Sequence, residues 1–326
     1  MNILVVGGAG YIGSHMVKEL RSEGFDPLVF DNLSTGHSWS VPEGRLLQGD
    51  LSDRERLREV FATHSFDAVM HFASFIQVGE SVQEPLKYYQ NNVANTLNLL
   101  EAMRDAEVKR FVFSSTAAVY GTPDSVPINE DSPLHPENPY GHSKLMIEQV
   151  LSDCEKAWGL RSARLRYFNA AGAHPGEAIG EAHNPESHLI PIILQVALGK
   201  REFITVNGDD YPTPDGTCIR DYIHVCDLAS AHTLALCALL DGSDSMVYNL
   251  GNGTGYSIQE VIEVCLEVTG HPIPVKIGSR RAGDPATLVA SSEKITKELG
   301  WKPRYADLRT IVETAWSWHK GGENRF

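Results

Sequence analysis

Residues 1–13 read MNILVVGGAGYIG, and this stretch decides the fold. The apolar run at residues 2–6 is typical of a buried strand, and apolar residues recur with helical period from Ile12 onward. The glycines between them predict a tight turn. At Gly7 and Gly10 no Cβ atom blocks a pyrophosphate from the helix N-terminus, where free N–H groups favour an anion. This stretch therefore indicates a nucleotide-binding strand–turn–helix unit.

The predicted second strand, residues 27–30, ends in an acid that selects the nucleotide. Asp31 stands close to the spacing of about 20 residues from the glycines that is expected for this acid. Among those glycines, Gly13 lets the first helix pack closely on the sheet. A carboxylate at residue 31 accepts hydrogen bonds from the ribose hydroxyls and repels a 2′-phosphate, which predicts NAD rather than NADP. Taken alone, Asp31 is equally compatible with an N-cap or turn in residues 31–34.

Strand and helix patterns alternate up to about Gly172. This order predicts an α/β fold with a Rossmann-type doubly wound parallel sheet, in which residues 1–172 bind NAD. We interpret residues 173–326, which are rich in Gly/Pro loops, as a smaller α/β lobe that binds the substrate. The apolar run 219–225 predicts a strand that returns to the large sheet, within a returning segment near 219–232. We expect strands near 2–6, 27–30, 45–48, 68–71, 110–114 and 162–167, and lobe helices near 188–198, 226–240, 257–269 and 307–318.

Several candidate contact residues follow the predicted strands, and ligands of open α/β sheets gather at the carboxyl ends of strands. Asp50 and Leu51 follow the third strand and are candidates for adenine contacts, although Asp50 is equally compatible with a turn. Phe72 and Ala73 follow the fourth strand. Thr116 follows the fifth, where its hydroxyl would hold a substrate oxygen unless the local backbone satisfies it.

Tyr140 and Lys144 stand one helical turn apart in a predicted helix. Residues i and i+4 of a helix have Cβ atoms about 5–6 Å apart, so an ammonium is held beside a phenol. The cation favours the phenolate, which can then take a proton from a sugar hydroxyl. In isolation the pair is better explained as an exposed helix face. Downstream of a nucleotide-binding loop, it indicates a redox enzyme.

Composition limits the partners of the 326-residue chain. An apolar content of 42% supports a full core, and a formal net charge of −14 argues against nucleic-acid and anionic-membrane partners. No apolar run approaches the roughly 20 residues needed to span a membrane, and the expected absence of a signal peptide predicts a cytoplasmic protein. Five cysteines without a C-x-x-C pair predict free thiols, and thirteen histidines without a known cluster predict no metal.

Taken together, the motifs resemble the extended short-chain dehydrogenase/reductase family, and within it the UDP-glucose 4-epimerases, over nearly the whole chain. The likeness lies in residues 7–15, 31–33, 78–82, 88–93, 165–169 and 220–225. It implies catalysis by Thr116, Tyr140 and Lys144. It implies that the cofactor is bound by Gly7, Gly10, Tyr11, Ile12, Gly13, Asp31, Asn32, Asp50, Leu51, Phe72, Ala73, Asn91, Tyr140, Lys144 and Tyr167. It implies that a UDP-sugar is bound by Thr116, Tyr140, Asn169, His188, Leu189, Thr205, Asn207, Arg220, Tyr222, Arg281, Asp284 and Leu288.

Some positions depart from the family pattern. Ile76 stands where some members have a lysine near the cofactor phosphates, His188 where asparagine is frequent, and Asn207 where an aromatic residue stacks on uracil. The implied role of Arg220 and Arg281 is to face the phosphates as bidentate donors. Without the resemblance, surface ion pairs would explain both arginines better.

The resemblance implies that UDP-glucose and UDP-galactose are interconverted by inversion at C4, through a 4-keto sugar and with tightly bound NAD. Alternatives are a 4-epimerase of UDP-N-acetylglucosamine, UDP-pentose or UDP-glucuronate, a nucleotide-sugar dehydratase or decarboxylase, and a non-enzymatic NAD sensor. A dehydratase needs an acid/base pair directly after the threonine, where this chain has Ala117 and Ala118. Family members usually form homodimers through helices near residues 82–103 and 140–158.

The resemblance also places Leu288 beside the C2 substituent of the sugar, where small residues accompany acceptance of N-acetyl sugars. A leucine there implies a preference for plain over acetylated sugars, because it fills the volume that an acetamide needs. The alternative is that Leu288 only packs beneath its loop.

If Asp31 selects the cofactor, the nucleotide that is released from the purified protein is NAD(H), because a carboxylate repels the 2′-phosphate of NADP. Extraction with acid or alkali, followed by chromatography against the four standards, measures this directly. Recovery of mainly NADP(H) would contradict the assignment of Asp31.

Overall fold

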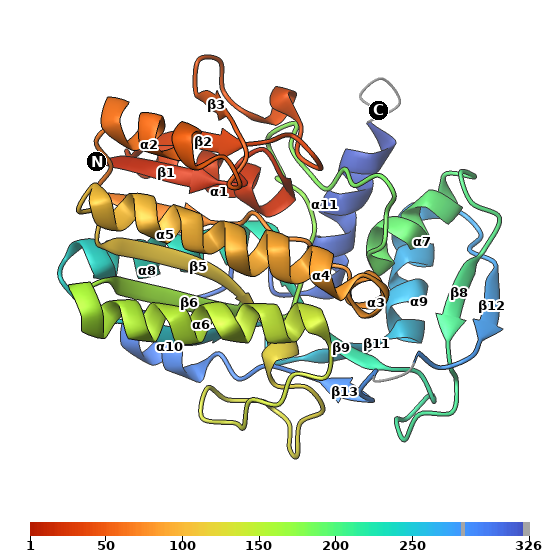
Figure 1. The fold of residues 1–326 in the computed structure, drawn as a ribbon. Helices are drawn as coiled ribbons and strands as arrows, with labels where there is room; N and C mark the ends of the chain where they lie inside the picture. Colours follow the sequence, from red (N-terminus) through yellow and green to blue (C-terminus); the bar gives the residue numbers. More distant parts are fainter. Residues whose placement is uncertain (282–283, 322–326) are drawn as a thin grey trace.

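A seven-stranded parallel sheet forms the centre of the computed structural model, which describes residues 1–281 and 284–321. Its strand order is β10-β6-β5-β4-β1-β2-β3, so β4 is the middle strand and β1 lies between β4 and β2. The carboxyl ends of the strands therefore lie on one edge, toward the smaller lobe (Figure 1). The strands are β1 (Asn2–Val6), β2 (Asp26–Asp31), β3 (Leu46–Gln48), β4 (Ala68–His71), β5 (Arg110–Thr116), β6 (Arg161–Tyr167) and β10 (Met246–Leu250).

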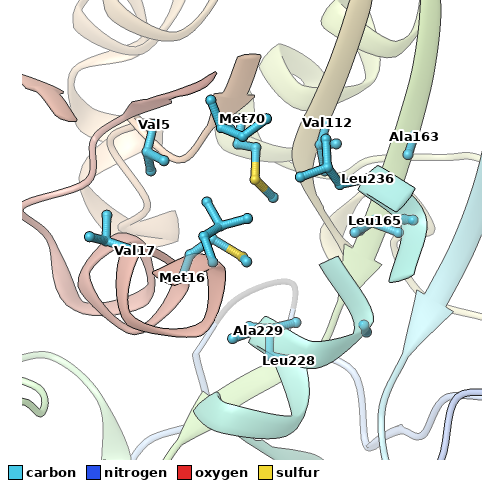
Figure 2. Packing of buried hydrophobic residues seen from close by; sticks show 14 of the residues in the cluster. Val5, Met16, Val17, Met70, Val112, Ala163, Leu165, Leu228, Ala229 and Leu236 are labelled. Atoms are coloured by element: carbon cyan, nitrogen blue, oxygen red, sulfur yellow. The ribbon is translucent and has the colours of Figure 1, made fainter. Parts of the chain in front are cut away.

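Helices cover both faces of this sheet because each central strand is apolar on both sides. Side chains alternate along β1, so Val5 faces one core and Leu4 faces the other. The first core packs against α1 and α8, with Met16 and Leu228 among its buried residues (Figure 2). The second core packs against α2, α5 and α6 (Figure 1). The helices are α1 (Tyr11–Ser22), α2 (Arg54–Thr63), α5 (Asn95–Asp105), α6 (Pro139–Trp158) and α8 (Val225–Leu240).

The smaller lobe contains two short sheets with helices beside them. In the first sheet β9 lies between β11 and β13 and also pairs with β7, while β8 and β12 form the second. A third apolar core, which includes Ile193, Val261 and Ile311, joins α7, α9 and α11. The elements are β7 (Asn169–Ala171), β8 (Ile204–Asn207), β9 (Ile219–His224), β11 (Gly255–Ser257), β12 (Val275–Gly278), β13 (Thr287–Leu288), α7 (Leu189–Ala197), α9 (Ile258–Thr269) and α11 (Leu308–Lys320).

The remaining helices have at most seven residues each. Among the described residues, no helix combines the length and the apolar character that crossing a membrane requires. The five cysteines are free. The remaining helices are η1 (Ser38–Ser40), α3 (Val78–Gln83), α4 (Pro85–Tyr88), the π-helix η2 (Tyr89–Ala94), η3 (Ala117–Val119) and α10 (Glu293–Leu299).

The expected fold class is confirmed. The expectation that residues 219–225 return to the large sheet is wrong. The six strands expected up to residue 167 and the four lobe helices all exist, with ends within two residues of the expected positions. However, the apolar run 219–225 does not return to the large sheet as a strand. It forms β9 of the lobe, and the seventh strand of the large sheet is β10, beside β6. An apolar run indicates a buried strand but does not specify its neighbours, and β9 is held in the lobe by β7.

Candidate active site

The glycine-rich turn lets three backbone segments meet without intervening side chains. Gly7 has a φ of +77°, and a Cβ atom there would lie 2.5 Å from the backbone nitrogen of Ala73. A Cβ atom at Gly13 would lie 2.2 Å from the carbonyl oxygen of Gly7. Gly10 is the N-cap of α1 without a side-chain cap, and a Cβ atom there would lie in van der Waals contact with the carbonyl oxygen of Gly7, at 3.4 Å. The N-terminus of α1 is therefore free to bind an anion such as a nucleotide pyrophosphate.

Asp31 makes two hydrogen bonds to backbone groups, one of which belongs to the local turn expected as the alternative to a cofactor contact. It lies at the carboxyl end of β2, where one carboxylate oxygen accepts from the backbone N–H of Ala9 at 2.9 Å and the other from that of Leu33 at 2.8 Å. The side chain thus braces both the glycine-rich turn and its own turn. Asn32, the next residue, donates to Asp50 at 2.6 Å, so the structure brings these two predicted contacts together.

Tyr140 and Thr116 come from different elements and meet at the carboxyl edge of the sheet. Thr116 is the last residue of β5. Its hydroxyl also accepts a hydrogen bond from the backbone N–H of Ala118 at 3.1 Å, which is the local backbone contact expected as the alternative to a substrate contact. Tyr140 is the second residue of α6, which Asn138 caps by accepting from the N–H of Gly141. Burial raises the pKa of Tyr140, and hydrogen bonding with Thr116 partly opposes this rise.

Lys144 is buried one helical turn beyond Tyr140. Its Nζ donates to Ser74 Oγ at 2.8 Å and to the carbonyl oxygen of Ser114 at 2.7 Å, and lies 6.0 Å from the centroid of the Tyr140 ring. Burial lowers the pKa of Lys144 to about 7, and the charge of Glu148 acts in the opposite direction. Tyr140 is 9% exposed and Lys144 2%, so the alternative of an exposed helix face is wrong.

A buried ion pair joins this part of α6 to strand β6. Glu148 lies one further turn along the helix and contacts Arg166 of β6 at 2.5 Å, with both side chains almost fully buried. The same carboxylate accepts from Ser115 at 2.5 Å, next to the candidate Thr116. Sequence reasoning missed this pair. Its only signal is that Glu148 continues the i+4 spacing of Tyr140 and Lys144.

The loop that carries Ser74 is fixed by a second missed residue, Asn92. Its side chain accepts from the backbone N–H of Phe75 at 2.9 Å and donates to the carbonyl oxygen of Phe75 at 3.0 Å and to Ser143 at 3.1 Å. The predicted contact Asn91 lies beside it and donates to its side-chain oxygen at 3.0 Å. Both belong to the π-helix η2, a form that is frequent at functional sites.

The other predicted cofactor contacts lie near the same edge of the sheet. Leu51 follows β3, and Phe72 and Ala73 follow β4. Tyr167 ends β6, and its hydroxyl is hydrogen-bonded to Ser114. Tyr11 opens α1 and donates to the carbonyl oxygen of Gly172 at 2.6 Å, which links the glycine-rich turn to the lobe.

Predicted substrate contacts share the four-stranded sheet of the lobe. Asn169 is paired in register with Tyr222, and Leu288 with Arg220. The side chain of Asn169 donates to the carbonyl oxygen of Asp221 at 2.9 Å. Leu288 also packs on the cluster that contains Ala117 and Phe168, which follow the candidate residues of β5 and β6.

The two predicted arginines lie in neighbouring parts of the lobe. Arg220 is mostly buried and forms an ion pair with Asp284. The exposed Arg281 faces Asn207 of β8, whose amide oxygen, once rotated toward it, accepts from the guanidinium at 3.1 Å. Asp284 donates its backbone N–H to the carbonyl oxygen of Arg281 at 3.4 Å, which connects the two places. Thr205 is exposed on β8, two residues before Asn207.

His188 and Leu189 stand at the start of α7, with His188 as the N-cap. The imidazole of His188 engages buried carboxylates, because its Nδ1 lies 2.7 Å from Glu181 and 3.1 Å from Glu186. The Nδ1 atom of His188 is thus engaged by the protein, and only the other atoms of its ring are available for the predicted contact with the substrate.

This fold and site define a nucleotide-dependent α/β enzyme, and comparison with known proteins narrows the class. The chain belongs to the NAD dependent epimerase/dehydratase family, whose model matches residues 3–251.

Individual relatives match almost the entire chain. The UDP-glucose 4-epimerase of Halalkalibacterium halodurans is 56% identical over 98% of this chain and 96% of its own. The enzyme of the same name from Lacticaseibacillus casei is 52% identical over 100% and 99%. A crystal structure of the UDP-glucose 4-epimerase from Brucella ovis in complex with NAD is 48% identical, with a TM-score of 0.94 over 97% of each chain. The resemblance expected from the motifs is confirmed.

The buried pair Glu148–Arg166 predicts a large loss of stability on removal of one charge. Glu148→Gln leaves Arg166 buried without its counter-ion, which costs about 3–5 kcal/mol of the free energy of unfolding. Urea unfolding measures the change. The matched control is Glu155→Gln, which removes a half-exposed pair with Arg161 and costs about 0–1 kcal/mol. Equal effects of the two substitutions would refute this account of the pair.

Proposed function

We propose that the chain interconverts UDP-glucose and UDP-galactose by inversion at C4, with NAD as its cofactor. The observation that carries the proposal is the meeting of Thr116, Tyr140 and Lys144 at the carboxyl edge of the sheet, beside a turn suited to a pyrophosphate. The relatives named UDP-glucose 4-epimerase support the choice of substrate.

In the proposed reaction, residues of the chain transfer the proton of the 4-hydroxyl and orient the sugar. The glycine-rich turn and Asp31 would hold NAD, which would supply hydride transfer from and to C4 of the sugar. Tyr140 takes the proton of the 4-hydroxyl and later gives it back, while the hydroxyl of Thr116 orients the sugar oxygen. Lys144 favours the phenolate by its charge, and Ser74 and the carbonyl group of Ser114 fix its ammonium.

Inversion needs a sugar that turns while its nucleotide stays bound. We assign this anchoring to Arg220 and Arg281 at the phosphates, with Asn169, Leu189 and Tyr222 nearby. Bidentate guanidinium contacts suit a diphosphate. The ion pair between Arg220 and Asp284 orients one of these donors in advance. Because the anchors hold the nucleotide and not the ring, the 4-keto sugar can rotate between the two hydride transfers.

We also propose how the chain divides into two units and in which cellular compartment the protein works. We assign the NAD-binding unit to residues 1–172, apart from the segment from β7 onward, together with α8 and β10. We assign the sugar-binding unit to the rest of the chain to residue 326, of which residues 282–283 and 322–326 lie outside the described part. Five free cysteines fit a reducing compartment. We therefore place the protein in the cytoplasm, where cell fractionation should recover it.

Tyr140→Phe tests the catalytic assignment. The change removes the proton-transferring hydroxyl and should lower kcat at least about 10²-fold while leaving NAD content and UDP affinity nearly unchanged. A coupled assay that detects UDP-glucose formed from UDP-galactose measures turnover.

The control is Tyr248→Phe, which loses a hydrogen bond to Glu298 outside the site and should keep near-normal turnover. Near-normal turnover of Tyr140→Phe would remove the catalytic role. Inactivity of the unaltered protein toward both sugars would refute the proposed function.

Leu288→Ala tests the range of sugars. A packed leucine beside C2 costs an acetamide about 1–3 kcal/mol, which corresponds to a roughly 5- to 150-fold preference for plain sugars. The ratio of kcat/KM for UDP-galactose over UDP-N-acetylgalactosamine should fall in the variant. If the ratio stays the same, Leu288 only packs beneath its loop.

We also propose a homodimer. Apolar side chains are exposed on helices that contact one another, with Val82 62% exposed on α3, Leu86 81% on α4 and Met146 46% on α6. Such a patch marks an interface. Light scattering should give twice the chain mass, and Val82→Glu with Leu86→Glu should give one chain mass. The control Leu266→Glu, on the exposed face of α9, should stay dimeric, and a monomeric unaltered protein would end the proposal.

A further inference from the structure

Four side chains outside the catalytic residues converge in the segment between β7 and α7. Glu181, His183, Glu186 and His188 each present one ligand atom, and among the described residues these atoms all lie within 4.8 Å of one another. The Nδ1 atoms of His183 and His188 lie 3.0 and 2.7 Å from Glu181 Oε1. They lie 3.8 and 3.1 Å from Glu186 Oε1.

Both carboxylates of this cluster are buried and carry the same charge. The side chains of Glu181 and Glu186 are 4% and 2% exposed, so their mutual repulsion is poorly screened by water. Glu186 also accepts from the backbone N–H groups of Ser187 and His188 at 2.7 and 2.9 Å, which fixes its orientation. Such a pair requires positive charge between the carboxylates, which a metal ion or two protons on the imidazoles could supply.

The separations within the cluster are close to the edge lengths of a small coordination tetrahedron. Zinc binds His nitrogen and Glu oxygen at about 2.0–2.2 Å, so neighbouring ligand atoms of a tetrahedral site lie about 3.3 Å apart. Three of the four His–Glu separations, 2.7, 3.0 and 3.1 Å, are somewhat shorter than this edge, and the fourth, 3.8 Å, is longer. Two imidazoles exclude calcium and magnesium as the preferred ions, because those bind oxygen ligands.

We propose that Glu181, His183, Glu186 and His188 bind a zinc ion in a four-coordinate, structural site. Four protein ligands fill the tetrahedron, which is typical of structural rather than catalytic zinc. The charge of the ion balances the two carboxylates. The half-exposed ring of His188 provides the entry path from solvent.

The ion would fix a segment that borders the glycine-rich turn. Gly180, Ala182 and His183 line one pocket together with Gly10 and Tyr11. Neighbouring backbone groups are held as well, since the carbonyl oxygen of Ala182 contacts His37 at 2.8 Å. Because α7 begins directly after His188, zinc would connect the start of this helix to the nucleotide-binding turn, and its loss would loosen both.

The experiment measures metal rather than turnover. Protein purified with zinc and dialysed against metal-free buffer should hold about one zinc ion per chain by mass spectrometry. Removal of zinc with a chelator should lower the melting temperature by at least about 3 °C, and added zinc should restore it. Replacement by Co²⁺ should give the intense visible absorption of a tetrahedral site.

Matched variants separate a built site from adventitious binding. Glu181→Gln and His183→Ala should each weaken zinc binding at least about tenfold. Glu177→Gln changes a carboxylate of the same segment that pairs with Lys18 at the surface, and it should keep full zinc content. If a variant fails to fold, the Co²⁺ spectrum of the unaltered protein still decides.

Two results would overturn the proposal. Unaltered protein without bound zinc, and with a melting temperature that added zinc does not change, would mean that two protons balance the carboxylates. Zinc content that is the same in Glu181→Gln, His183→Ala and the unaltered protein would place the ion elsewhere.

Discussion

Contact between bare backbone segments at the glycine-rich turn is the constraint on which the site depends. Gly7 lies against the backbone of Ala73, and Gly13 lies against Gly7. A side chain at Gly7 would push the turn away from the end of β4, and one at Gly13 would push α1 away from the turn. The end of β4 leads to Ser74, which accepts a hydrogen bond from Lys144, so the packing of the turn also reaches the lysine to which we assign a catalytic role.

Burial shifts the pKa values of Tyr140 and Lys144 in opposite directions, and both shifts favour the neutral form of the side chain. It raises the pKa of Tyr140 and lowers that of Lys144 to about 7. The charged pair that proton transfer needs is therefore not favoured by the protein alone. Anionic phosphates bound nearby would raise the pKa of Lys144 again, because an opposite charge stabilises the ammonium. In the proposed mechanism, binding of ligands and readiness for proton transfer are thus coupled.

The sequence predicted the elements whose pattern is local. The run at residues 2–6, the glycines after it and the Tyr140–Lys144 spacing each depend on neighbouring residues, and the structure places them as expected. Long-range partners could not be read in the same way. The pairing of β9 with β7 and the contact of Glu148 with Arg166 join segments whose contact leaves no periodic signal.

The join between β9 and α8 limits how the protein can move. β9 ends at His224 in the lobe, and α8 begins at the next residue, Val225, and packs against α1 of the central sheet. No loop separates this strand from this helix, and the two pack in different parts of the protein. Any rotation of the lobe at this join would therefore be confined to the one or two residues at the boundary of β9 and α8.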